Sequence, residues 1–359
     1  MLSSIAKPFA ALALAAALIS IVLAALGASP FGMFAALGEG AFGSWYACVD
    51  TLVKSTPLIF TGLAVSVAFS GALWNIGADG QLTIGAIAAG AVGTHLEDFP
   101  YLLAIVIILA AGALGGAVWG GVAGWLRARR DVNEVISTIM LNFVAVQMLS
   151  WMVHGPLMEP SRAYPTSSPI ASTAQLEFYF APSRLNLGML LAVVLAVACY
   201  TLLFHTSAGF ELRAMGRNRR AATFFGIRIP ALTVWVMALS GALAGLGGAV
   251  QVSAISHRLY EKLSPGWGFE AIAVALVARL NPLAVIPAAL LFGALDNGSQ
   301  AMQRTQGISP ELVQVIQALV ILIILAFDTP AWTGLRENIF GASSGDAAAV
   351  PPVAEMPDA

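Results

Sequence analysis

The sequence predicts an all-α, polytopic membrane protein of about ten transmembrane helices. Of its 359 residues, 58% are hydrophobic and only 10% are charged, whereas a soluble domain carries roughly 25% charged residues. The apolar runs are about 20 residues long, which is the length of a membrane-spanning helix rather than of the roughly 9–11-residue strand of a barrel. The 35 glycines suit helix packing in lipid, where small residues let backbones approach closely.

The predicted spans are the apolar segments, in order along the chain. They lie near residues 9–28, 56–75, 80–95, 101–125, 134–153, 186–205, 231–254, 268–280, 282–300 and 312–328. The first is longer than the apolar core of a signal peptide and predicts a retained helix, although small residues at 26–29 leave a cleaved signal peptide open. The segment at 268–280 is too short for a full span and predicts a half-helix.

The placement of Lys and Arg predicts the orientation of the chain. The densest basic clusters lie at 127–130 and 213–228 with two spans between them, so both lie on one side, which the positive-inside rule assigns to the cytoplasm. Counting spans outward from these clusters puts both termini in the cytoplasm. Residues 1–340 then form a single transmembrane domain with a proline-rich external loop at 154–185, followed by a disordered cytoplasmic tail at 341–359.

Two local patterns predict helix starts. Asp131 and Glu134 have the spacing of a capping box at the start of the fifth span. Asn281 precedes Pro282, which puts a cap residue before a proline at the first helical position of the ninth span.

The segment NIGADGQ, from Asn75 to Gln81, lies between the second and third spans and is the first candidate functional site. Glycine loosens a helix inside the membrane only where protein or a water-filled cavity satisfies the freed backbone groups. Polar side chains at that depth are functional by default, so Asn75, Asp79 and Gln81 are predicted to line or gate a passage. The alternative is a tight turn at the cytoplasmic surface, with Asp79 capping the third span.

A second candidate is a polar stripe on the fifth span. Glu134, Thr138 and Asn142 recur every four residues and therefore lie on nearly one face of the helix. They predict either a stripe that faces the pathway, or a cap at Glu134 followed by interhelical hydrogen bonds from Thr138 and Asn142.

The third candidate lies around the eighth and ninth spans. Glu270 opens the short eighth segment, where an acidic side chain suits the positive end of the helix dipole. Trp267 and Phe269 beside it predict either anchors at the membrane interface or a wall that stacks against a sugar or a base. Asp296 and Asn297 precede a glycine and predict a helix end on the external side.

Residues 210–226 form a compact, basic, helix-compatible segment between long apolar runs. A charged element surrounded by membrane spans lies in water at the face of the membrane. A loop built as a helix, where a minimal connector would suffice, predicts that a soluble partner docks on it.

Several kinds of site are missing from the sequence. None of its lysines follows a glycine, so there is no Walker A loop, and an ATPase that drives this protein must be another chain. The four histidines show no metal-ligand spacing, no serine lies in a nucleophile elbow, and the two cysteines, Cys48 and Cys199, form no disulfide framework. The net charge of −2 gives no sign of nucleic-acid binding.

Four motifs, in this order within residues 50–330, resemble those of a known family. They are Asn75–Gln81, Asp131–Asn142, Glu211–Ile227, and Gly268–Leu276 with the following Asn281–Leu283. The chain is similar to the permease subunits of bacterial ABC importers of the branched-chain amino acid, ribose and simple-sugar type. Within that family it most resembles the nucleoside and simple-sugar branch.

The resemblance implies a permease of the bacterial inner membrane that moves nucleosides or simple sugars by alternating access and has no ATPase site of its own. It implies a cytoplasmic ATPase that holds ATP and Mg²⁺, a second permease as heterodimer partner, and an external substrate-binding protein, so this chain itself binds no cofactor. The implied ATPase-coupling residues of the 210–226 segment are Glu211, Arg213, Gly216, Arg217, Asn218, Ala222 and Gly226. The candidate pathway residues are Asn75, Asp79, Gln81, Thr138, Asn142 and Phe269.

Two other functions compete with this one. A secondary transporter coupled to protons or sodium would use Asp79 as its coupling carboxylate and would need no ATPase. An intramembrane enzyme is disfavoured by the missing nucleophile and metal sites. The cargo stays open between nucleosides, pentoses, hexoses and other small solutes.

Overall fold

The computed structural model describes residues 29–176 and 185–306, with isolated positions at 17, 20, 315 and 318. These residues are helical, as predicted, with no strand among them and isolated β-bridges in loops. In chain order the elements are α2 (Pro30–Phe42), α3 (Trp45–Ser70), α4 (Ala78–Gly93), α5 (Tyr101–Arg130), α6 (Glu134–His154), η1 (Ser172–Ala174), α7 (Leu187–His205), α8 (Ser207–Arg217), α9 (Arg219–Phe224), α10 (Ile229–Val250), the π-helical turn η2 (Gln251–Ser256), α11 (Trp267–Val277) and α12 (Pro282–Gln306).

Six of the described helices are long and apolar enough to cross a membrane, namely α3, α5, α6, α7, α10 with η2, and α12. The predicted spans at 9–28 and 312–328, and the tail at 341–359, lie outside the continuously described residues. The predicted spans at 80–95 and 268–280 form α4 and α11, which have 16 and 11 residues and are shorter than a typical span. The prediction that residues 268–280 form only a short helix is confirmed.

The second predicted span is wrong at both ends. Helix α3 begins at Trp45, where Ser44 caps it by accepting a hydrogen bond from the amide of Ala47, and it ends at Ser70 rather than at residue 75. Polar Asp50 and Lys54 hide its first half from an apolar pattern. The helix tolerates Lys54 because its ammonium group lies 2.8 Å from the carboxylate of Asp296 on α12.

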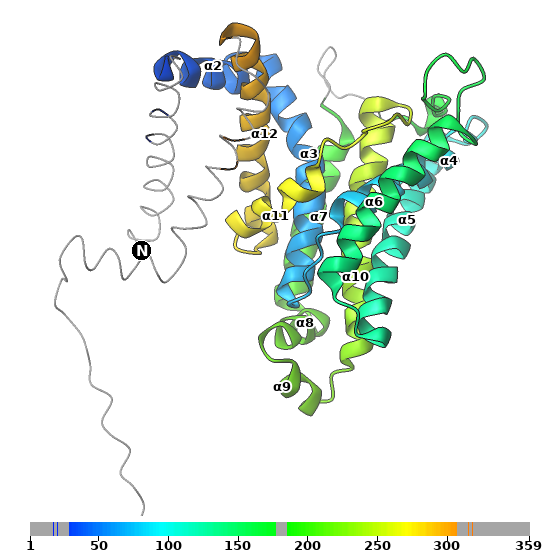
Figure 1. The fold of residues 1–359 in the computed structure, drawn as a ribbon, viewed down its shortest axis with the longest axis vertical. Coiled ribbons are helices and arrows are strands. Elements are labelled where there is room, and N and C mark those ends of the chain that lie inside the picture. Colours follow the sequence, from blue (N-terminus) through cyan, green and yellow to red (C-terminus); the bar gives the residue numbers. More distant parts are fainter. Residues whose placement is uncertain are drawn as a thin grey trace, which may run out of the picture.

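Helix α2 was not predicted, and it lies across the end of the helix group opposite α8 and α9 (Figure 1). Ser29 caps it by accepting a hydrogen bond from the amide of Gly32, and Pro30 occupies its first helical position. Several aromatic side chains on and just after it are exposed, namely Phe31, Phe42, Trp45 and Tyr46. The cap and the proline were readable in the sequence, but α2 is shorter than a span and does not follow the pattern of one.

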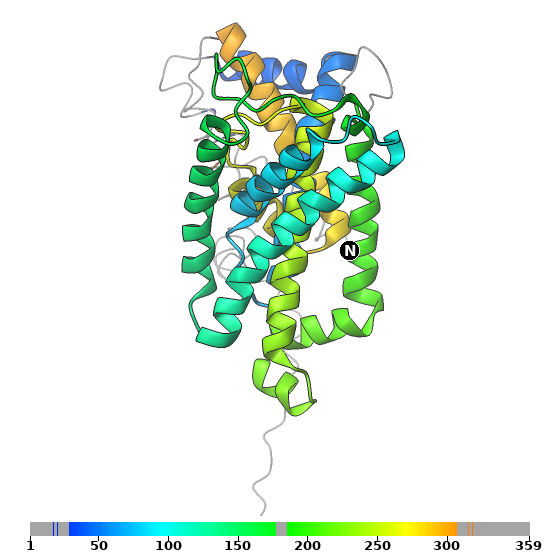
Figure 2. The same ribbon diagram turned by 90° about the vertical axis from the view of Figure 1, so that its right-hand side faces the viewer.

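The centre of the fold is α10, which packs against α5, α4 and α3. Gly116 of α5 and Gly241 of α10 face each other, and a Cβ on either would overlap the carbonyl oxygen of the other. The two helices therefore approach through their backbones, and they cross each other in Figure 2.

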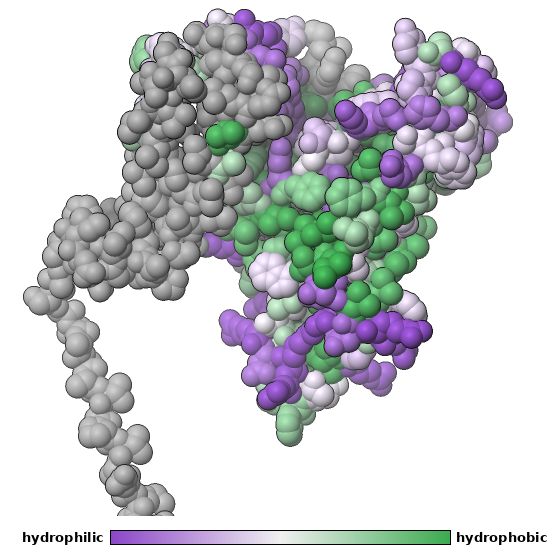
Figure 3. Space-filling view, in the orientation of Figure 1, coloured by the Kyte–Doolittle hydropathy of each residue, from purple (hydrophilic) through white to green (hydrophobic). Residues whose placement is uncertain are grey.

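The outer helices carry the apolar surface. Only 28% of the residues in the apolar windows of α5, α6 and α7 are buried in this chain. Figure 3 shows a hydrophobic band between two more hydrophilic ends, the lower of which lies over α8 and α9. This surface is that of a helical membrane protein, because the band has nothing in the described chain to cover it.

The predicted helix signals have mixed outcomes. Asn133, not Asp131, caps α6 by accepting a hydrogen bond of 2.9 Å from the amide of Val135. Asp131 instead ends α5 in a left-handed conformation and pairs with Arg127 at 2.7 Å. The start of α12 at Pro282 is confirmed.

The predicted helix end at Asp296 and Asn297 is wrong, because α12 continues to Gln306. The Asn297 amide donates hydrogen bonds to the carbonyl oxygens of Gly40 and Ala47, both 3.0 Å away. Asp296 pairs with Lys54 of α3, and Asn297 joins α12 to both α2 and α3. These contacts explain why two polar side chains occur in the middle of α12.

Candidate functional site

The chain loses its helical structure between Gly71 and Gly77 and regains it at Ala78, where α4 begins. The end of α3 lies on α8, because a Cβ on Gly71 would touch the side chain of Met215. From there the chain runs non-helically to the start of α4. Non-helical stretches of this kind are tolerated inside a membrane protein only where other groups satisfy the freed backbone.

Asn75 and Gln81 pair through their amides at this break. Asn75 donates to the Gln81 side-chain oxygen at 2.9 Å, and Gln81 donates back to the Asn75 oxygen at 3.0 Å. Asn75 also donates to Ser240 of α10 at 2.8 Å, and Ser240 donates to the carbonyl oxygen of Ala64 of α3 at 2.6 Å. Asn75, Gln81 and Ser240 are buried, so this network fixes the break between α3 and α10.

Asn142 of α6 satisfies the backbone on the other side of the break. Its oxygen accepts a hydrogen bond from the amide of Gly80, and its nitrogen donates to the carbonyl oxygen of Ile76, both at 2.9 Å. Thr138, one turn earlier, donates to the carbonyl oxygen of Glu134 at 2.6 Å and lies against Gly77. Both side chains are buried, so the polar stripe predicted on this helix faces the interior.

Asp79 links the start of α4 to the start of α11. Its carboxylate accepts hydrogen bonds from the hydroxyl of Ser264 at 2.6 Å and from the backbone amide of Gly268 at 3.0 Å. Only 6% of Asp79 is exposed. The N-termini of two short helices therefore meet at one acidic side chain, as the positive ends of helix dipoles favour.

The predicted pathway residues thus divide into two groups. Asn75, Asp79, Gln81, Thr138 and Asn142 form a buried polar cluster around the break before α4, which we call the hinge cluster. Phe269 lies in the first turn of α11 and is 48% exposed. Whether these side chains line the path of the cargo stays a prediction.

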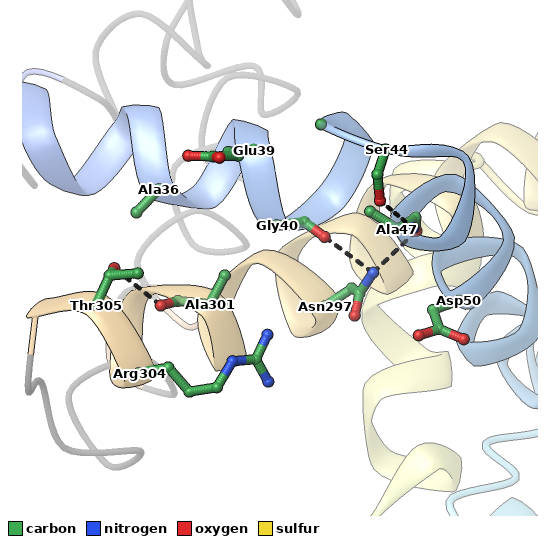
Figure 4. Close-up of a pocket in the computed structure, with 11 residues that line it drawn as sticks. Ala36, Glu39, Gly40, Ser44, Ala47, Asp50, Asn297, Ala301, Arg304 and Thr305 are labelled. Atoms are coloured by element: carbon green, nitrogen blue, oxygen red, sulfur yellow. Dashed lines mark hydrogen bonds between the residues drawn. The ribbon is translucent and has the colours of Figure 1, made fainter.

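A first cavity, of about 390 Å³, lies between α2, α3 and α12 (Figure 4). Asn297 lies at its wall with its amide directed at α2 and the start of α3, and Glu39, Asp50 and Arg304 lie around it. The cavity carries charged groups of both signs, and α2 covers one side of it.

A second cavity, of about 300 Å³, adjoins the first and shares Asp50, Asn297 and Arg304 with it. It lies between the first half of α3, the π-helical turn η2, the start of α11 and the end of α12, and Gln251 and Trp267 are among its lining residues. Gln251 was missed by the sequence analysis. The signal that could have found it is a glutamine inside a long apolar run. Polar side chains in membrane helices are rare and functional by default.

The basic segment forms two short helices, α8 and α9, rather than one. Asn218 ends α8 and caps α9, where its side-chain oxygen accepts a hydrogen bond from the amide of Ala221 at 3.1 Å. Leu212 and Met215 of α8 are fully buried, and a Cβ on Gly216 would overlap the carbonyl oxygen of Ser70. The segment is therefore seated tightly against the end of α3.

The opposite face of the segment is free within the described chain. Glu211, Arg217 and Arg220 are exposed, whereas Arg213 is half-buried and lies over the ring of Phe204, 5.0 Å from its centroid. Phe224 and Phe225 are 95% and 85% exposed, and Gly226 turns the chain with a φ of 81°. Exposed aromatic side chains beside arginines are typical of a surface that binds another protein.

Comparisons with known proteins identify the family of the chain. Residues 47–325 match the family model described as the branched-chain amino acid transport system / permease component. A guanosine ABC transporter permease of Bacillus subtilis is 34% identical over 90% of this chain and 93% of its own length. A glucose ABC transporter permease of Haloferax volcanii is 33% identical over 85% of this chain and 83% of its own length. A ribose import permease of Escherichia coli K12 is 28% identical over 76% of this chain and 81% of its own length. No solved structure matches the chain.

Proposed function

Because the chain belongs to the family of permease components of branched-chain amino acid-type transport systems, which are ABC importer subunits, we propose that it carries nucleosides or simple sugars across a bacterial inner membrane. The observation that supports this cargo most is the similarity, over nearly the whole chain, to permeases of guanosine and of glucose. An uncharged cargo also suits a chain in which only 10% of residues are charged.

ATP hydrolysis is supplied by a separate ATPase in this proposal, and that ATPase docks on α8 and α9. The exposed Phe224 and Phe225, with Arg217 and Arg220 near them, form the contact surface, which we call the coupling face. Gly216 transmits the movement, because no side-chain atom separates it from the end of α3. The coupling face and both termini lie in the cytoplasm, and the loop after His154 lies outside.

Movement of the coupling face reaches the interior through the hinge cluster. α3 ends on α8, and the non-helical stretch after it leads directly to Asn75, Asp79 and Gln81. A push on α3 therefore shifts the starts of α4 and α11 together, since Asp79 holds both. This is the alternating-access step of the proposal, and the hinge cluster lies beside the cargo path.

The remaining partners are a second, different permease and an external substrate-binding protein. Three spans of this chain, α5, α6 and α7, bury only 28% of the residues in their apolar windows, and the surface left uncovered is shared between lipid and the sister permease. The binding protein meets the end of the molecule at which α2 and the end of α12 lie.

The test is recovery of the complex from mild detergent by a tag on this chain, followed by mass spectrometry. The proposal predicts that an ATPase, a second permease and a binding protein are recovered with it in fixed ratio. Recovery of this chain alone, with uptake driven by an ion gradient after reconstitution, contradicts the proposal and favours a secondary transporter.

A further inference from the structure

The second cavity, between α3, η2, α11 and α12, has the composition of a ligand site and no role in the coupling described above. Its volume of about 300 Å³ is at the lower end of the range for small-molecule pockets, roughly 300–1,000 Å³. We propose that it is a binding site for the sugar ring of the cargo, either a free sugar or the ribose of a nucleoside. This inference rests on the proposed function and extends it to named residues.

Gln251 is the polar side chain of this cavity on which the proposal rests. The residue is only 8% exposed, and its side-chain amide makes no hydrogen bond within the described part of the chain. An amide offers two donor hydrogens and an acceptor oxygen, which match a pair of neighbouring hydroxyl groups, each of them donor and acceptor.

The π-helical turn explains how Gln251 comes to line the cavity. α10 is α-helical to Val250, and the chain then widens into η2, so Gln251 and Ile255 both line the same space. π-Helical turns are rare and occur mostly at functional sites, because they cost regular hydrogen bonding. A regular α-helix would have served for packing alone.

Trp267 provides an apolar surface in the same cavity. It is partly buried at the first position of α11, and Val53, Pro57 and Ile255 line the same cavity. An indole ring offers a large flat apolar surface, and the C–H face of a furanose or pyranose ring is apolar in the same way. A wall of this kind beside an amide fits a ring that has one apolar face and a hydroxylated edge.

The charges around the cavity balance. Lys54 pairs with Asp296 at 2.8 Å, and Asp50 and Arg304 contribute one charge of each sign. Asp296 lies outside the lining but neutralises Lys54, so the lining keeps no excess of cationic groups for a phosphorylated cargo. The balance favours an uncharged, hydroxylated cargo.

The test compares sugars that differ by one hydroxyl group. The complete complex, with its ATPase and binding protein, is reconstituted in liposomes, and initial uptake is measured for guanosine, 2′-deoxyguanosine, ribose, 2-deoxyribose and leucine. We expect wild-type protein to prefer the hydroxylated member of a pair and Gln251→Leu to reduce that preference about tenfold. The binding protein is the same in both measurements, so its own selectivity cancels.

Two matched controls separate binding from folding. Gln147 and Trp151 are exposed residues of α6, so Gln147→Leu and Trp151→Ala repeat the same changes far from the cavity and are expected to keep the preference. Trp267→Ala is expected to lower uptake of every sugar-containing cargo, and Trp267→Phe to restore most of it, because a flat ring remains.

Each outcome decides one claim. An unchanged preference in Gln251→Leu, or an equal loss for both members of a pair, overturns the site while wild-type uptake still supports the proposed function. Uptake of leucine but of none of the other compounds by the wild type overturns the proposed cargo and the site with it. The guanosine and ribose pairs tell whether a nucleoside or a free sugar occupies the cavity.

Discussion

The carboxylate of Asp79 accepts a hydrogen bond of 3.0 Å from the backbone amide of Gly268, which lies 189 positions later in the chain. A Cβ on Gly268 would overlap the backbone of Asp79, so the two helix starts touch without any side chain between them. Two short helices that point their N-termini at one acidic group form a joint, and a joint in the interior is what a permease that changes its accessible side requires.

Asp79→Asn tests this joint directly. Asparagine has the same shape but lacks the negative charge, so the hydrogen bonds from Ser264 and Gly268 weaken to those between neutral groups. We expect uptake to fall about tenfold while the amount of protein in the membrane stays the same. Uptake equal to that of the wild type would remove Asp79 from the mechanism and leave it as a structural cap.

Gly268→Ala tests the contact from the other side. The added Cβ has no space beside the backbone of Asp79, so α11 must move away, and overpacking of this kind costs about 1–3 kcal/mol. We expect a lower melting temperature in detergent and a loss of uptake. Gly121→Ala is the matched control, because a Cβ there meets only the side chain of Ala238 at 3.7 Å.

Asn142→Leu is expected to destabilise the fold. It removes the partner of both the Gly80 amide and the Ile76 carbonyl, and each buried group left unpaired costs about 1–3 kcal/mol. The measurement is thermal unfolding of the purified protein in detergent. Gln147→Leu, on the exposed face of the same helix, is expected to leave the melting temperature unchanged. Equal melting temperatures for the two variants would contradict the role given to Asn142.

Gly216→Ala tests transmission from the coupling face. The new Cβ overlaps the carbonyl oxygen of Ser70 and pushes α8 away from the end of α3. We expect uptake to fall at least about tenfold while ATP hydrolysis by the complex continues, since the ATPase still binds. Gly121→Ala again serves as the control. Normal uptake by Gly216→Ala would show that close contact at this point is not needed.

The double variant Phe224→Ser, Phe225→Ser tests the coupling face itself. Burial of one such side chain in an interface is worth about 1.5–3 kcal/mol, so loss of both should weaken ATPase binding by at least about tenfold. The measurement is the concentration of ATPase that half-saturates detergent-solubilised permease. Phe31→Ser, an 85% exposed position at the other end of the molecule, is the control. Unchanged binding would mean that the ATPase docks elsewhere.

The sequence predicted the helical fold and the residues of the hinge cluster, but not their partners. Asn75, Asp79 and Gln81 were recognisable because glycines and polar groups interrupt apolar spans. Their contacts with Ser240 and Gly268 depend on which helices pack together, and no local pattern encodes that. Whether residues 75–81 form a surface turn or an interior segment also depends on which helices pack around them, so the sequence alone left both alternatives open.

Other differences have local causes. Asp131 has capping-box spacing, yet Asn133 is nearer to the first helical turn and caps it, while Arg127 holds Asp131 and also lies 3.1 Å from Glu134. The first half of α3 escaped the apolar pattern because Lys54 is neutralised by a residue of α12. The turn η2 has no sequence signature, since a π-helix differs from an α-helix only in how the backbone is wound.

The most direct test of the whole account is uptake into liposomes that contain this chain, its sister permease and its ATPase. The account predicts that guanosine or a simple sugar enters only when both ATP on the ATPase side and the loaded binding protein on the other side are present. It also predicts that collapsing the proton and sodium gradients has no effect. Uptake without ATP that stops when a gradient is collapsed would contradict it.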